Sequence, residues 1–108
     1  MNIPKLQIGN LTATTPIVQG GMGVRISMAS LAAAVAEEGG IGTISSIGLG
    51  DFEAAKSDYE TISREALQEE IRKARSMTKG VLAINFMGVL RNVEDLLKTA
   101  VREGIKMI

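Results

Sequence analysis

The apolar positions along the chain form short runs separated by longer stretches of helical spacing. The runs occupy residues 17–19, 41–45, 81–85 and 105–108 and are rich in Ile, Val and Leu. Such runs are typical of buried strands in a parallel sheet. A weaker alternation over residues 5–15 predicts a short hairpin or cap before the first strand.

The intervening stretches predict three helices. Ser27 or Ser30 is expected to cap an alanine-rich helix over residues 31–38. Ser63 is expected to cap a second helix and Asn92 a third. The apolar faces of these two helices comprise Leu67, Ile71, Ala74, Val93, Leu96, Leu97, Ala100 and Val101. The polar stretch before the second helix, residues 46–62, is predicted to be a long loop, which is commonly functional or mobile in a compact domain.

A glycine stands between each helix and the strand that follows it, in "AEEGGIGTI", "SMTKGVLAI" and "VREGIKMI". Each glycine offers a left-handed stop to its helix. Strands that alternate with helices in this way form a parallel sheet with right-handed crossovers, so the fold class is α/β. Because the last run reaches Ile108 as a strand, we expect the chain to be the first part of a larger domain.

Composition narrows the classes of function. The 12 Lys and Arg balance the 12 Asp and Glu, which disfavours nucleic acid as a partner. Cysteine and histidine are absent, so disulfides, thiolate catalysis, and the usual general base and zinc ligand are excluded. No signal-peptide pattern and no apolar run of about 20 residues is visible. We therefore expect a cytoplasmic protein without a membrane partner.

The stretch "PIVQGGMG" over residues 16–23 is the first candidate for chemistry. Its glycines could form a tight turn, a phosphate cradle or a floor for a flat ligand. A dinucleotide fingerprint does not fit, because Ile26 stands where a third small residue is needed. Ser45 and Ser46 also stand where that fingerprint has an acid, and the chain has no Walker G-K-[ST] motif. A simple turn and a ligand site both remain open, and Met22 alone is more often core filler.

Asn85 is the second candidate. It ends an otherwise apolar strand, and α/β folds bind ligands at the carboxyl ends of strands. An asparagine that caps the following loop explains the same residue equally well.

The order of "PIVQGGMG", "AEEGGIGTI" and "GVLAINFM" resembles the nitronate monooxygenase family, once called 2-nitropropane dioxygenases. Flavin-dependent enoyl-acyl carrier protein reductases share this pattern. The resemblance covers essentially the whole chain. It implies a (β/α)₈ TIM barrel with FMN as the cofactor. Residues 1–108 would then be the N-terminal part of the barrel, namely three βα units and the start of the fourth strand.

Carried over by position, the resemblance assigns Gly21, Met22 and Gly23 to the face of the flavin ring and Asn85 to a hydrogen bond with FMN. Glycines would let backbone amides approach a flat ring where a Cβ would collide. The catalytic histidine and the late phosphate-binding loops of the family have no counterpart in these 108 residues. We therefore assign no catalytic residue and expect the isolated chain to be inactive.

Three hypotheses of function follow. The resemblance implies an FMN-dependent oxidoreductase that oxidises small alkyl nitronates with molecular oxygen. The alternative within the same resemblance is an enoyl thioester reductase that uses NAD(P)H. A hypothesis of another class is a non-catalytic half-barrel that self-associates as a homo-oligomer through open strand edges. The cause would be apolar side chains that a lone half-barrel leaves uncovered, and the candidates are Ile17, Ile44, Leu82, Ile84 and Met107.

Overall fold

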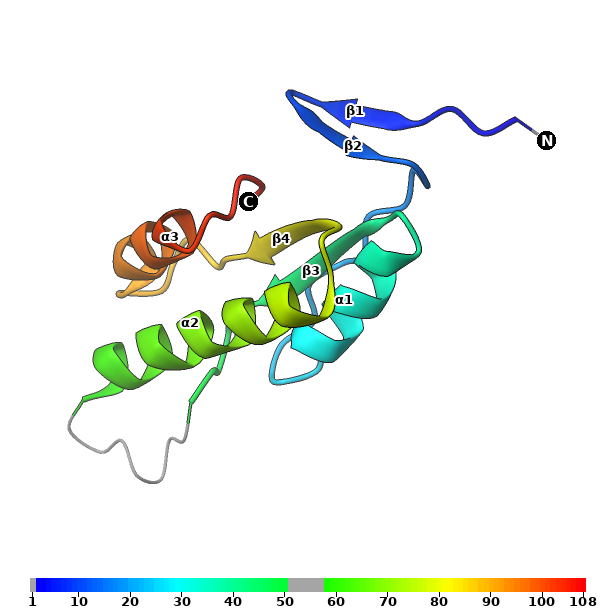
Figure 1. Cartoon of the computed structure of the whole chain (residues 1–108). Helices are drawn as coiled ribbons and strands as arrows, with labels where there is room; N and C mark the ends of the chain where they lie inside the picture. Colours follow the sequence, from blue (N-terminus) through cyan, green and yellow to red (C-terminus); the bar gives the residue numbers. More distant parts are fainter. Residues whose placement is uncertain (1, 51–57) are drawn as a thin grey trace.

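The computed structural model describes residues 2–50 and 58–108. Within these residues a hairpin of β1 (Leu6–Ile8) and β2 (Leu11–Ala13) comes first. It is followed by α1 (Ala29–Glu37), β3 (Ile41–Ser45), α2 (Tyr59–Met77), β4 (Val81–Asn85) and α3 (Val93–Arg102) (Figure 1). The hairpin predicted over residues 5–15 is thus confirmed, and strands alternate with helices as the pattern indicates.

The parallel sheet predicted from the apolar runs is confirmed. β3 and β4 pair in parallel along their full length, with Ile41 opposite Val81. Val18 makes a single parallel bridge to Ile41, and Met107 makes one to Ala83. The four predicted strands therefore lie side by side in chain order, although the first and the last are each reduced to one bridge.

Residues 17–19 were predicted to form a buried strand, and the prediction that they are buried is wrong. Ile17 is 60% exposed and Val18 is 56% exposed. The cause is their position at the edge of the sheet, where β3 covers one side of this segment only.

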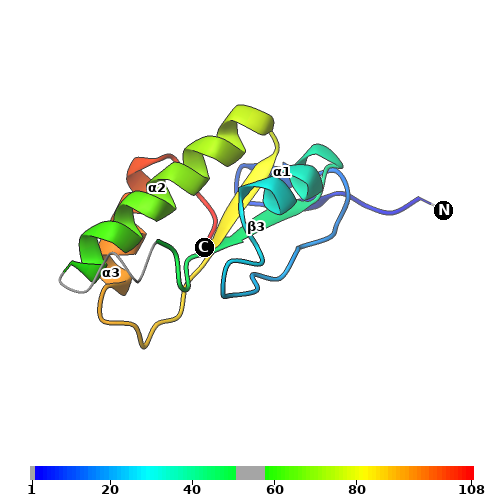
Figure 2. The ribbon, with the colours of Figure 1, turned by 90° about the horizontal axis from the view of Figure 1, so that it is seen from below.

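All three helices pack against the same face of the sheet. Figures 1 and 2 show α1 and α2 side by side along it. Ile44, Leu82 and Ile84 lie on this face and are buried with side chains of the helices. Gly42 also lies here, and a Cβ on it would overlap the carbonyl group of Ala32. The absence of a side chain at Gly42 therefore lets α1 rest directly on β3.

The hairpin covers part of the opposite face. A second buried cluster joins Ala13 of β2 to Ile41 and Ala83, with Leu6 packed against it. Figure 1 shows the hairpin beside the amino ends of β3 and β4. This face is consequently covered at its amino end, and its carboxyl end is left for a site.

The first helix begins between the two predicted caps, and neither of them caps it. α1 starts at Ala29, after an extended Met28 that makes no side-chain cap. Ser27, a predicted cap, is buried and accepts a hydrogen bond from the N–H of Met22 instead. Ser30, the other predicted cap, lies inside the helix. Tertiary contacts of Ser27 thus override its local capping propensity.

The second helix begins before its predicted cap. α2 starts at Tyr59, because the Asp58 carboxylate accepts the N–H of Thr61 as an N-cap. Ser63 therefore lies inside the helix, where its hydroxyl donates to the Tyr59 carbonyl over 2.8 Å. The loop predicted over residues 46–62 accordingly ends earlier, and its portion at 51–57 lies outside the described residues.

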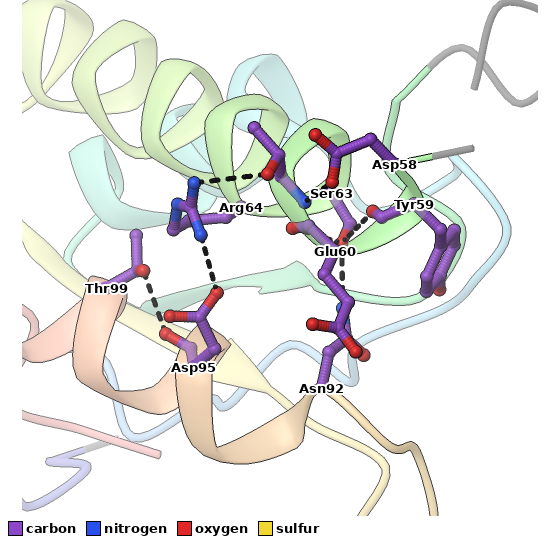
Figure 3. Close-up of polar contacts among 9 residues, drawn as sticks. Asp58, Tyr59, Glu60, Ser63, Arg64, Asn92, Asp95 and Thr99 are labelled. Atoms are coloured by element: carbon purple, nitrogen blue, oxygen red, sulfur yellow. Dashed lines mark hydrogen bonds and ion pairs between the residues drawn. The ribbon is translucent and has the colours of Figure 1, made fainter.

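Asn92 does stand at the N-cap position of α3, as predicted, but its side chain makes no capping bond. Its Nδ2 instead donates to the Ser63 hydroxyl over 2.7 Å, and both residues are buried (Figure 3). Arg64 and Asp95 form an ion pair of 3.1 Å beside them. Polar contacts therefore link the first turns of α2 and α3.

The predicted glycine stops hold for two of the three helices. Gly39 after α1 and Gly104 after α3 have φ of +85° and +83°. The prediction is wrong for Gly80, because α2 already ends at Met77 and Gly80 is not left-handed. A Cβ on Gly80 would instead overlap the backbone of Ala36, so this glycine allows close packing on α1.

Candidate functional site

A hollow of about 350 Å³ opens where the parallel strands end. Its lining includes Gly20, Gly21, Thr43, Ala83, Asn85 and Phe86. A volume of this size lies within the range of small-molecule sites. The position is also where α/β sheets bind ligands, outside the carboxyl ends of their strands.

Gly21 and Asn85, two of the predicted site residues, meet in this hollow. A Cβ on Gly21 would overlap the Cβ of Asn85 and lie 2.9 Å from its Cγ. It would also lie 3.3 Å from Cγ2 of Thr43. Because Gly21 has no Cβ, the loop after residues 17–19 can contact β3 and β4 directly, which no other residue type would allow in this backbone.

The carboxamide of Asn85 is partly buried. Its backbone carbonyl accepts the N–H of Ser46 over 3.0 Å. Within the described part of the chain, no hydrogen bond joins its side chain to another protein group. A loop cap would require such a bond. The geometry thus favours a carboxamide that is available to a ligand.

Met22 and Gly23 lie elsewhere in the same loop. The N–H of Met22 donates to the Ser27 hydroxyl over 2.8 Å, and its side chain is 58% exposed. A Cβ on Gly23 would lie 3.1 Å from Cβ of Ile47, so Gly23 packs on the loop after β3. Neither residue lines the hollow. Their assignment to a cofactor stays a prediction.

Gln19 also belongs to the lining, although its sequence context predicted only part of an apolar strand. Its Oε1 accepts the N–H of Thr43 over 3.2 Å, and its Nε2 donates to the Thr43 carbonyl over 3.1 Å. The same Nε2 donates to the Ser27 hydroxyl over 3.2 Å. The signal that could have revealed it is a carboxamide within an apolar run, immediately before two glycines.

Two more polar side chains stand at the end of β3. Ser45 and Ser46 are each 1% exposed. Their hydroxyls have no hydrogen-bond partner within the described residues. Ser45 Oγ lies 3.4 Å from the position that a Cβ on Gly23 would take, so it lies under the loop rather than in the hollow.

The lining of the hollow contains no ionisable side chain. The side chains with a shifted pKa are Arg72 on α2, Glu94 on α3 and Glu103 directly after α3. The hydrogen bonds of Arg72 and Gln68 lower the pKa of the Glu103 carboxyl, and Lys98 lowers that of Glu94. No group of three acidic, histidine or cysteine side chains that could hold a metal occurs among residues 2–50 and 58–108. The site can therefore bind and orient a ligand, but its own side chains supply no acid, base or electron carrier.

None of the helices in the described ranges is long and apolar enough to cross a membrane.

Comparison with known proteins identifies the family. The sequence profile described as "Nitronate monooxygenase" matches residues 5–106, nearly the whole chain. The chain belongs to the nitronate monooxygenase family. The resemblance noted from the three motifs is thereby confirmed.

A solved structure of FabK from Thermotoga maritima is also similar to this member of the family. It matches with a TM-score of 0.63 and 28% sequence identity, over 83% of this chain. The chain spans 24% of the length of that FabK chain. No curated protein matches the sequence.

Proposed function

We propose that the protein carrying this chain is an FMN-dependent oxidoreductase that oxidises alkyl nitronates with molecular oxygen. The observation that carries the proposal is the hollow in which Gly21 rests on Asn85. Membership of the nitronate monooxygenase family supports the class of reaction.

We further propose that these residues are the first three βα units and the fourth-strand start of a (β/α)₈ barrel. The strand positions lie in chain order, and α1, α2 and α3 cover one face only. A doubly wound sheet would carry helices on both faces. The hairpin covers the amino end of the other face, opposite the end at which barrels hold their active sites. The similarity to FabK supports the same arrangement.

The residues present fit a flavin ring. Ala83 and Phe86 give the hollow apolar walls. The Asn85 carboxamide and the N–H groups of Gly20 and Gly21 have no protein partner within the described residues. An apolar pocket with a few unpaired polar groups suits a planar heterocycle with donors and acceptors on its edge. Because Gly21 has no side chain, its backbone can lie close to the face of such a ring.

In this proposal the chain binds and orients, and FMN when bound supplies the electron transfer that no lining side chain can perform. The backbone N–H groups of Gly20 and Gly21 would hold the ring by hydrogen bonds, and the Asn85 carboxamide would add another. Ala83 and Phe86 would exclude water from the ring face. The nitronate itself would be a small-molecule substrate held by parts of the protein outside this chain.

FMN binding by the complete protein tests the proposal. We expect a purified protein with flavin absorbance that consumes oxygen when 2-nitropropane nitronate is added. Asn85→Ala should weaken FMN binding about fivefold, because a lost hydrogen bond is worth about 1 kcal/mol. Fluorescence titration with FMN measures this.

Asn92→Ala is the matched control. It removes a carboxamide that bonds Ser63 and does not line the hollow, so it should lower the melting temperature and leave FMN affinity unchanged. A wild-type protein that binds no FMN contradicts the proposal. An Asn85→Ala variant that loses only stability would instead identify Asn85 as a structural residue.

The second candidate is the enoyl thioester reductase that shares the sequence pattern, and the similarity to FabK favours it. The two activities need different partners for the flavin. Oxidation of NADPH in the presence of crotonyl thioester, without oxygen uptake on nitronate, would decide for the reductase.

A further inference from the structure

The hydrogen bonds between residues 17–19 and β3 explain why this pairing stops at Gln19. The Ile41 N–H donates to the Ile17 carbonyl over 2.9 Å, and the Gln19 N–H donates to the Ile41 carbonyl over 3.0 Å. In a parallel ladder the next rung on β3 belongs to Thr43, two residues further along. Its partners would be the carbonyl of Gln19 and the N–H of Gly21.

The side chain of Gln19 occupies that rung instead. Its Oε1 accepts the Thr43 N–H, and its Nε2 donates to the Thr43 carbonyl, at 3.2 and 3.1 Å. A carboxamide can do this because it carries an acceptor and a donor like those of a peptide group. Within the described residues, the Gln19 carbonyl and the Gly21 N–H consequently have no hydrogen bond to the protein.

The same carboxamide also fixes the loop that follows. Its Nε2 donates to the Ser27 hydroxyl over 3.2 Å. That hydroxyl accepts the Met22 N–H over 2.8 Å and donates to the Gly20 carbonyl over 3.3 Å. Ser27 is 1% exposed, and its one proton and two lone pairs are all used. Gln19 and Ser27 thus hold the two sides of Gly21 in place.

We infer that Gln19 is a positioning residue. By bonding Thr43 with its side chain it ends the pairing of residues 17–19 with β3, and so keeps the Gly21 N–H free in the hollow for an acceptor on the flavin ring. The identity of that acceptor rests on the proposed function, but the release of the Gly21 N–H from the sheet does not. An apolar residue in place of Gln19 would leave the N–H and carbonyl of the buried Thr43 unpaired. Since such groups are costly, the Gly21 backbone is expected to move onto Thr43.

Gln19→Leu in the complete protein tests the inference, with Gln7→Leu as the matched control. Gln7 bonds the Gly9 carbonyl in the hairpin, at the other end of the sheet. Gln19→Leu should bind FMN about tenfold more weakly and shift the flavin absorption bands. The reason is that the Gly21 N–H and its loop would move away from the ring. Gln7→Leu should match the wild type in both. Unchanged affinity and spectrum in Gln19→Leu would overturn the inference.

Amide hydrogen exchange of the FMN-free protein gives a readout that is independent of the flavin. The Gly21 N–H should exchange rapidly in the wild type and become protected in Gln19→Leu, as the ladder extends to it. Protection of Gly21 in the wild type would overturn the inference. If the wild type binds no FMN, the proposed function fails, and the exchange result still decides whether Gln19 ends the strand.

Gln19→Glu serves if the leucine variant does not fold. The carboxylate keeps an acceptor for the Thr43 N–H but cannot donate to the Thr43 carbonyl. The same loss of FMN affinity is expected, and wild-type affinity in this variant would contradict the role of the Nε2 group.

Discussion

At the scale of single residues, Gly21 and Asn85 form one unit. The contact is between backbone and Cβ, since a Cβ on Gly21 would overlap the Cβ of Asn85 itself. Asn85 is anchored in turn by its place at the end of β4, opposite Ser45. A substitution that adds a Cβ at Gly21 or removes the Cβ of Asn85 changes this contact, so such substitutions should not be additive.

Gly21→Ala should therefore lower the stability of the FMN-free protein by about 1–3 kcal/mol, the usual cost of an overpacked contact. Asn85→Gly should relieve most of this loss, because it removes the opposing Cβ. Asn85→Ala should relieve little, because it keeps that atom. Thermal unfolding of the single and double variants measures the coupling. Strictly additive losses for Gly21→Ala and Asn85→Gly would mean that the loop has moved away from β4.

At the scale of elements, polar contacts hold α2 and α3 together from the first turn of α3 to its end. Asn92 and Ser63 join their first turns, and Arg64 bonds Asp95 (Figure 3). Further along, Arg72 bonds Glu103 over 2.9 Å at the end of α3. β4 follows α2 along the chain, and the strand position at Met107 follows α3. The docking of the two helices therefore helps to fix the walls of the hollow.

The Arg72–Glu103 pair makes helix docking dependent on pH. Hydrogen bonds from Arg72 and Gln68 lower the pKa of the Glu103 carboxyl below its ordinary value of 4.5. A folded-state pKa below the unfolded one stabilises the protein above pH 4.5, and this stabilisation is lost as the pH falls through the folded value. The effect should be small, because the Arg72 side chain is 65% exposed.

Glu103→Gln should accordingly flatten the fall in melting temperature below pH 4.5 relative to the wild type. Above that pH the variant should be slightly less stable. Melting curves across the acid range measure both effects. Wild-type and variant curves that stay parallel throughout would show that the pair contributes nothing to folding.

At the scale of the whole molecule, three exposed apolar side chains lie at or next to the edges of the sheet. Ile17, Val18 and Ile108 are 60%, 56% and 63% exposed. From the sequence we expected Ile44, Leu82 and Ile84 to be uncovered as well. That expectation is wrong, because the three helices bury all of them to 2% exposure or less. The strand edges are therefore the surface through which we expect the chain to associate, because they also carry unpaired backbone groups.

We propose that the 108-residue chain self-associates edge to edge. Val18→Lys should weaken this association, since a charge on an edge strand opposes pairing with another strand. Val101→Lys is the matched control, because Val101 is 61% exposed but lies on α3. Sedimentation velocity at micromolar concentration distinguishes the variants. A wild-type chain that sediments as a monomer, or equal weakening by both substitutions, would contradict the edge model.

Local features were predictable from the sequence alone. The α/β class, the parallel strands over 41–45 and 81–85, and the stops at Gly39 and Gly104 all follow from periodicity and from backbone freedom within a few residues. Family membership was also readable, because the order of three motifs carries it. Each of these depends on neighbours along the chain, which a sequence displays directly.

Tertiary structure alone decided how the residues of the hollow contact one another. Gln19 pairs with Thr43 across 24 positions, and Gly21 rests on Asn85 across a still longer separation. Ser27 likewise does not cap α1, because its hydroxyl accepts the N–H of Met22 in the preceding loop. Capping and strand propensities are worth about 1 kcal/mol or less, so a buried hydrogen-bond network or a close backbone contact outweighs them. These contacts exist only once the sheet has brought distant segments together, so a local pattern can mark a residue such as Gln19 but does not give its partner.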